Sequence, residues 1–196
     1  MSYKALDICY NFSFFLPEEL DEIFHAHEKV TFQKGDFILE EGKTANEYYI
    51  LEKGLVRSFV NDFSGNEVTT HFFVENEVII EVSSLFQRIP TQENIVCITD
   101  CECWKFNFET FQNLFHKIPN LREWGRAWMS HQLFVYKQRS VEMFTLSATK
   151  RYLNLLEQKP HVIQCAPLKQ IASYLGVTDT SLSRIRKELV SHPKKN

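Results

Sequence analysis

Short apolar runs that alternate with glycine-containing turns constrain this chain more than any other feature of its sequence. Between residues 30 and 106, stretches rich in Val, Ile, Phe and Thr occupy positions 48–51, 56–60 and 68–73. The turns between such stretches contain Gly35, Gly42, Gly54 and Gly65. Glycine supplies the positive φ that tight turns need, and strands recurring about every 8–12 residues are typical of an all-β sandwich or barrel. The sequence therefore predicts a β-rich unit here.

Helical patterns surround this unit. A short helix is expected over residues 16–24 and another over 108–117. Asn120 is expected to cap a long helix that reaches about Phe144, and Ser147 to cap a further helix over 150–158. Pro160 is expected to stop that helix. We place the domain boundary near residue 145.

The two halves of the chain carry opposite charge. Residues 1–120 contain 20 acidic and 9 basic side chains, a net charge of −11, whereas residues 121–196 contain 5 acidic and 13 basic, a net charge of +8. Such an asymmetry indicates a partner of opposite charge for the basic half, and nucleic acid is the leading candidate.

Residues 168–187 have the pattern of a helix-turn-helix. Gly176 can adopt the left-handed conformation that closes a first helix, and the small side chain of Ala172 lets two helices cross closely. The shared apolar centre is expected to consist of Ile171, Leu175, Val177, Leu182 and Ile185. The alternative is an amphipathic helical hairpin with a solvated basic face.

The second helix of this motif is predicted to enter the major groove of DNA. Thr178 or Asp179 can cap it, and Arg184 can make a bidentate contact with guanine. Phosphate contacts are expected from Thr178, Ser181, Arg186 and Lys187. The predicted DNA-binding residues are Thr178, Asp179, Thr180, Ser181, Arg184, Arg186 and Lys187.

Other functional classes find less support. The five cysteines do not form a disulfide framework, and Cys101 and Cys103 lack a second pair for a zinc or iron–sulfur site. His71 is alone on its strand and is expected to be a packed or surface residue. We predict no catalysis, metal or cofactor. No apolar run is long enough to span a membrane and no signal peptide is recognised, so a cytoplasmic location is expected.

The chain resembles the CRP/FNR regulators over residues 12–190. Residues 34–42 and 49–57 are similar to the first strands of a cyclic-nucleotide-binding domain, and 151–156, 171–177 and 184–185 to the family's DNA-binding domain. The resemblance implies an α+β fold: a jelly-roll-like β-roll over 1–119, a dimerisation helix over 120–144 and a winged-type helix-turn-helix domain over 145–196. It also implies a homodimer, a small-molecule effector, a two-fold symmetric DNA site and RNA polymerase as a partner.

Two sets of residues follow from this resemblance. The long helix would pair with its copy through Leu121, Trp124, Trp128 and Val135, although this face could instead pack only against its own β-roll. The effector pocket is predicted to consist of Glu81, Ser83, Thr91 and Gln92.

The pocket departs from the family pattern. Glu81 matches the residue that holds the ribose hydroxyl, but Ile80 replaces the glycine that precedes it. Thr91 or Gln92 stands where the family has an arginine for the cyclic phosphate, and Glu93 follows. The wing after the second helix is also short. We therefore expect a transcription regulator whose pocket does not bind cyclic AMP. The alternatives are a small-molecule sensor that acts without DNA and a cupin-like metalloenzyme.

Overall fold

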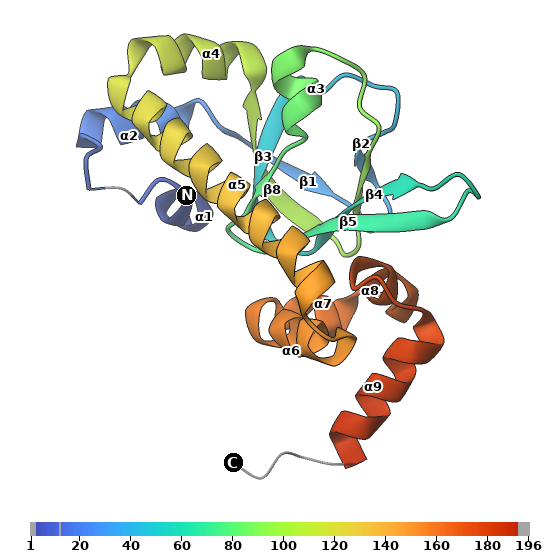
Figure 1. Ribbon diagram of the computed structural model, residues 1–196. Helices are drawn as coiled ribbons and strands as arrows, with labels where there is room; N and C mark the ends of the chain where they lie inside the picture. The colour runs from blue at the N-terminus through green and yellow to red at the C-terminus, as the bar shows by residue number, and fades with distance from the viewer. Residues whose placement is uncertain (1–2, 12, 192–196) are drawn as a thin grey trace.

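A computed structural model describes residues 3–11 and 13–191 and shows a β-roll followed by a helical half (Figure 1). The roll consists of two antiparallel sheets with strand orders β1-β8-β3-β6 and β2-β7-β4-β5. Its strands are β1 (Glu28–Phe32), β2 (Phe37–Leu39), β3 (Glu47–Lys53), β4 (Val56–Asn61), β5 (Glu67–Phe73), β6 (Val78–Ile79), β7 (Asn94–Cys97) and β8 (Cys101–Asn107). The predicted β-rich unit is confirmed.

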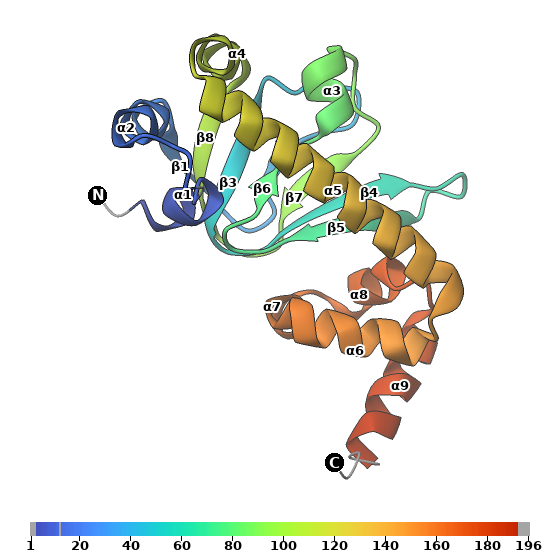
Figure 2. The ribbon, with the colours of Figure 1, turned by 60° about the vertical axis from the view of Figure 1, so that its left-hand side comes forward.

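Helices flank the roll and form the second half of the chain. They are α1 (Lys4–Cys9), α2 (Pro17–His25), α3 (Val82–Gln87), α4 (Phe108–Lys117), α5 (Pro119–Thr145), α6 (Ala148–Gln158), α7 (Pro160–Cys165), α8 (Leu168–Tyr174) and α9 (Asp179–Ser191). In both views α5 runs across the roll and descends to the group formed by α6, α7 and α8, from which α9 projects (Figure 2).

Most helix boundaries agree with the sequence, and the differences have local causes. Ser147 caps α6 as predicted, since its hydroxyl accepts from the Lys150 N–H at 3.2 Å. The expected cap at Asn120 is wrong, because α5 starts with Pro119 and the Asn120 amide donates instead to Glu19 Oε2. Pro160 separates α6 from a helix that the sequence did not predict, since it occupies the first turn of α7, where proline is tolerated.

The turn at Gly54 shows why glycine is needed between two strands. Gly54 has φ +115°, and a Cβ there would lie 2.7 Å from the carbonyl oxygen of Asp100. Only a residue without a side chain lets the β3–β4 connection approach this backbone so closely. The two strands are thereby brought into different sheets of the roll.

The predicted fold class is confirmed for the roll, the long helix and the helical C-terminal region. The predicted short wing would follow α9 at positions 192–196, which lie outside the described residues. Within the described residues, no helix is long and apolar enough to cross a membrane.

The largest part of the core lies between the β1–β8–β3–β6 sheet and helices α1, α2, α4 and α5, and it encloses a small polar cluster. The Tyr10 hydroxyl lies 2.9 Å from the Tyr48 hydroxyl and 3.3 Å from His27 Nε2. His27 Nδ1 lies 2.8 Å from the Ile23 carbonyl oxygen, which makes it a donor and leaves Nε2 as an acceptor for Tyr10. Neutral His27 therefore fits this cluster.

We expect His27 to make the fold sensitive to acid. Burial lowers the pKa of His27 from its ordinary value of 6.5 to about 4, so the unfolded chain binds a proton more readily than the folded one. The free energy of unfolding should be unaffected above pH 6.5 and should fall by about 3 kcal/mol as the pH drops to 4. Urea unfolding across pH 4–8 measures this, and His27→Gln should flatten the acid limb. The matched control is His25→Gln, at an exposed position of α2. An equal slope in His27→Gln and wild type would contradict the assignment.

Candidate nucleic-acid interface and effector cavity

Helices α8 and α9 form the predicted helix-turn-helix. Gly176 closes α8 with φ +65°, and the Val177 N–H donates to the Ala172 carbonyl at 3.0 Å. Thr178 then caps α9, since its hydroxyl accepts from the Ser181 N–H at 3.2 Å. Of the two capping candidates, Thr178 therefore fills the position, and Asp179 is the first residue of the helix.

The two helices share one apolar centre. Ile171, Ala172, Leu175, Leu182 and Ile185 are all buried, and Val177 packs against them as a partly buried residue. Helices α6 and α7 complete the same cluster through three buried side chains, Tyr152, Leu155 and Val162. This packing fixes α9 relative to α8.

The polar side of α9 is open to solvent. Thr180, Arg184 and Lys187 are separated by four and three residues, so they lie on one helical face, opposite the buried Leu182 and Ile185. The other predicted DNA-binding side chains flank this face: Thr178, Asp179 and Arg186 are exposed, and Ser181 is half-buried. The structure thus places three of the seven predicted residues on one exposed face of α9.

Several cations of the basic half serve the fold instead. Arg151 donates to the carbonyl oxygens of Leu146 and Leu175, at 2.5 and 2.9 Å, and so ties the end of α5 to the end of α8. Arg139 and Lys159 reach the β-roll, as described next. The positive charge of residues 121–196 is therefore divided between an exposed set on α9 and an internal set.

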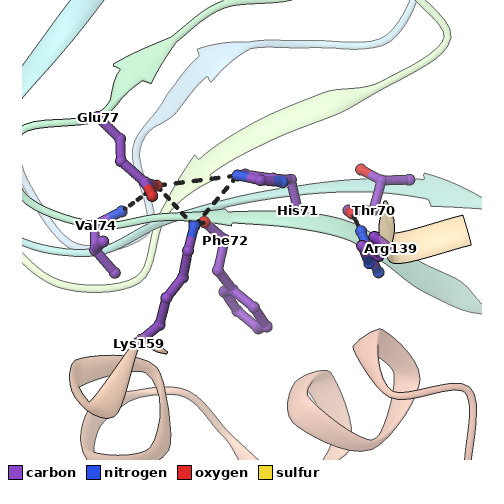
Figure 3. Close-up of polar contacts among 7 residues, drawn as sticks. All are labelled: Thr70, His71, Phe72, Val74, Glu77, Arg139 and Lys159. Carbon is purple, nitrogen blue, oxygen red and sulfur yellow. Dashed lines mark hydrogen bonds and ion pairs between the residues drawn. The ribbon is translucent and has the colours of Figure 1, made fainter. Parts of the chain in front are cut away.

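The internal set joins the helical half to β5 (Figure 3). Arg139 on α5 donates to the Thr70 carbonyl, and it donates to the Tyr174 carbonyl at 3.2 Å. Lys159 donates to the Phe72 carbonyl at 2.6 Å and pairs with Glu77 at 2.8 Å. Burial lowers the pKa of Lys159, and the Glu77 carboxylate partly offsets this effect. Sequence reasoning assigned none of these residues.

Residues 81–93, the cassette region, contain the four predicted pocket residues and a single arginine, Arg88. Glu81 caps α3, and its carboxylate accepts from the N–H groups of Ser83 and Ser84. It borders a cavity of about 220 Å³ inside the roll, whereas Ser83, Thr91 and Gln92 do not line that cavity. Grouping the four as one pocket is therefore wrong. Ser83 and Gln92 are exposed, and Thr91 is buried with its hydroxyl bonded to the Glu93 backbone.

Arg57 and Arg88, the two arginines of residues 1–119, have other partners. Arg57 is 2% exposed, and it donates to Glu67 Oε2 at 2.5 Å and to Thr69 Oγ1 at 2.9 Å. Arg88 donates to the Ala45 carbonyl at 2.6 Å and lies over the ring of Phe108. Lys43 lines the cavity but pairs with Glu40.

Glu93 adds negative charge to this region. Burial raises the pKa of its carboxyl, the hydroxyls of Thr70 and Ser58 lower it, and the nearby Glu81 raises it. Two carboxyl groups that influence each other oppose the entry of a third anion.

A larger cavity, of about 800 Å³, lies between α5 and the roll. Phe73, Val78 and Ile80 line it from the roll, and Trp128 and Val135 from α5. Its polar wall consists of His71, Glu77, Arg139, Lys159 and Tyr174 together with Glu142 and further side chains.

The predicted pairing seam on α5 needs correction. Leu121 and Trp124 are 0% and 3% exposed because they pack into the core of their own β-roll, as the alternative interpretation held. Trp128 and Val135 are half-buried on the same side of α5. The apolar side chains that stand out from the opposite side are Leu133, Phe134, Val141 and Phe144.

His71 is half-buried beside Lys159, with its Nε2 3.4 Å from Lys159 Nζ, and its ring packs against Phe73. The expectation of a packed histidine is confirmed. Within the described residues, no three His, Cys, Asp or Glu side chains are grouped so as to hold a metal ion.

The family model for the cyclic nucleotide-binding domain matches residues 29–117. No curated protein matches the chain by sequence. Solved structures do match: FixK2 from Bradyrhizobium japonicum has a TM-score of 0.74 at 16% identity, covering 85% of this chain and 86% of its own. The c-di-GMP responsive regulator CLP from Xanthomonas campestris has a TM-score of 0.69 at 17% identity, covering 90% and 92%.

A third structure extends the likeness. It is a putative transcriptional regulator of the CRP/FNR family from Eubacterium rectale, with a TM-score of 0.70 at 14% identity, covering 91% of this chain and 85% of its own. Together these comparisons confirm the resemblance to the CRP/FNR fold.

Proposed function

We propose that this chain is a sequence-specific DNA-binding transcription regulator. Its residues 29–117 match the cyclic nucleotide-binding domain, and its helices complete the CRP/FNR fold. The observation that carries the proposal is the exposed polar face of α9. This face presents Thr180, Arg184 and Lys187 at the end of a packed helix-turn-helix. A helix of this kind reads base edges through its first turns and touches phosphates with its basic side chains.

The regulator would act as a homodimer paired through α5. Leu133 and Phe144 are 71% and 88% exposed, and with Phe134 and Val141 they form an apolar face on one side of the helix. A monomer would leave this patch in water. Two copies paired along α5 would bury it and would present two copies of α9 to a symmetric site.

The effector would not be a cyclic nucleotide. Arg57 and Arg88 are committed to other partners, and Glu81 and Glu93 place negative charge in the cassette region. A neutral or weakly charged molecule is the better candidate. RNA polymerase as a partner, a cytoplasmic location and the absence of catalysis stay predictions.

Replacing Arg184 tests DNA recognition directly. A binding site is first selected from random DNA duplexes with the wild-type protein. Arg184→Ala should then cost about 1–3 kcal/mol on that site and relax specificity at one base pair in each half-site. Lys187→Ala should weaken binding to all sequences and reduce the salt dependence. Unchanged binding of Arg184→Ala to specific and random DNA would refute the recognition helix. Failure of the wild type to select any sequence would favour a sensor that acts without DNA.

Charge on the exposed face of α5 should dissociate the dimer. Light scattering at micromolar concentration is expected to give twice the chain mass for the wild type and the chain mass for Leu133→Glu with Phe144→Glu, because carboxylates would be buried at the seam. Leu156→Glu, at an exposed leucine of α6, is the matched control and should stay dimeric. A monomeric wild type would contradict the homodimer.

Calorimetry should detect no micromolar binding of cyclic AMP or cyclic GMP. Loss of a charge-assisted bond to a buried anion costs about 3–5 kcal/mol, which is roughly two to four decades in affinity. Micromolar binding by the wild-type dimer that is lost in Glu81→Ala would overturn this expectation.

A further inference from the structure

The outer edge of β5 is the place where the helical half holds the β-roll. β5 is the last strand of its sheet, so the backbone groups on its outer side have no neighbouring strand. The pairing with β4 shifts between Ser58 and Phe59, which leaves Thr70 as the extra residue of a β-bulge. A bulge and a strand edge both present backbone groups that need other partners.

Side chains of the helical half supply these partners. The Ser173 hydroxyl accepts from the Thr69 N–H at 2.9 Å and donates to the Glu67 carbonyl at 3.3 Å. Lys159 donates to the Phe72 carbonyl, and Arg139 donates to the carbonyl of the bulged Thr70. All of these contacts join the roll to the helical half, and those of Ser173 and Lys159 join it to residues 145–191, which include α9.

Arg139 is the contact that joins three elements at once. It belongs to α5, one of its terminal nitrogens bonds β5 at Thr70, and the other bonds α8 at the Tyr174 carbonyl. Its guanidinium also lies 3.8 Å from the centroid of the Tyr174 ring. A planar fork with donors on both nitrogens can bridge two carbonyl groups while stacking on an aromatic ring, which an ammonium group cannot do.

We propose that Arg139 is a positioning residue for DNA recognition. By bridging Thr70 and Tyr174 it sets the orientation of α8 and α9 relative to the β-roll. The inference rests on the proposed DNA-binding function. Because α8 and α9 share one apolar centre, fixing the end of α8 fixes α9 as well. A two-fold site requires both recognition helices at a set separation, and a loosely held domain must be ordered on binding.

The bridge borders the larger of the two cavities, which lies between α5 and the roll. Arg139, Lys159 and Tyr174 all line the cavity of about 800 Å³ between α5 and the roll. A molecule held in that cavity contacts the residues that orient α9.

Comparing a full two-fold site with a single half-site separates positioning from simple stability. The probes are duplexes selected from random DNA by the wild-type protein, and half-site duplexes cut from them. Arg139→Met should bind the full site roughly tenfold more weakly and the half-site with unchanged affinity, because the two domains lose their preset spacing. Arg139→Lys should behave like Arg139→Met. Arg126→Met is the matched control, since Arg126 is an exposed arginine of α5 that pairs with Glu123, and it should match the wild type.

Three outcomes would overturn the proposal. Equal weakening on full site and half-site would indicate a general loss of stability. A tighter full-site complex in Arg139→Met would mean that the bridge holds α9 away from DNA. Full recovery in Arg139→Lys would show that charge alone, without the two-carbonyl bridge, is sufficient.

A measurement without DNA keeps the bridge testable on its own. Hydrogen exchange should be several-fold faster at the Thr69 amide in Arg139→Met than in the wild type, because this amide is held by Ser173 of α8. Amides of β3 and β8 should keep their wild-type rates. Unchanged exchange at Thr69 would refute the bridge, whether or not the wild-type protein selects a DNA sequence. Failure of the wild type to select any DNA sequence would refute the proposed function but not the bridge.

Discussion

The open edge of β5 is the constraint on which the arrangement of the two halves depends. A strand edge in water is a site for unwanted pairing, and its backbone groups cost free energy if they are covered without partners. This chain covers the edge with a helical domain and satisfies it with Ser173, Arg139 and Lys159. The docking of the helix-turn-helix is thus part of how the roll completes its hydrogen bonding.

Packing reinforces the same junction. Leu55, Phe72 and Ile98 of the roll belong to one apolar cluster with Tyr152 and Val162 of the helical half. The cluster crosses the domain boundary predicted near residue 145, so the edge of the roll and the core beneath α9 are in direct apolar contact. The helical half is therefore held by apolar contact and oriented by polar contact, and the two effects act on the same surface.

Much of the fold and part of the site could be predicted from local sequence, because local rules govern them. The turn glycines, the Ser147 cap and the apolar register of Ile171, Leu175 and Leu182 each depend on neighbours within a few residues. The pairing seam could not be predicted, since periodicity identifies an apolar face of α5 without saying what covers it. Leu121 and Trp124 proved to face their own roll. The β5 contacts were missed for a related reason: Arg139 and Lys159 look in sequence like the cations that bind DNA.

Burial distinguishes the cations that can attract DNA from those that hold the fold together. An exposed cation attracts phosphate through long-range charge, and Arg184 and Lys187 keep that property on the surface of α9. Lys159 is desolvated against Phe72 and paired with Glu77, so its charge is directed at these partners and not at solvent. In the roll, the carboxyl of Glu93 directly follows Thr91 and Gln92, the positions that match the family's arginine for the cyclic phosphate. The cations of the helical half therefore fall into two groups: those exposed on α9, and those that bond the backbone at the edge of β5 and hold the helical half against the roll.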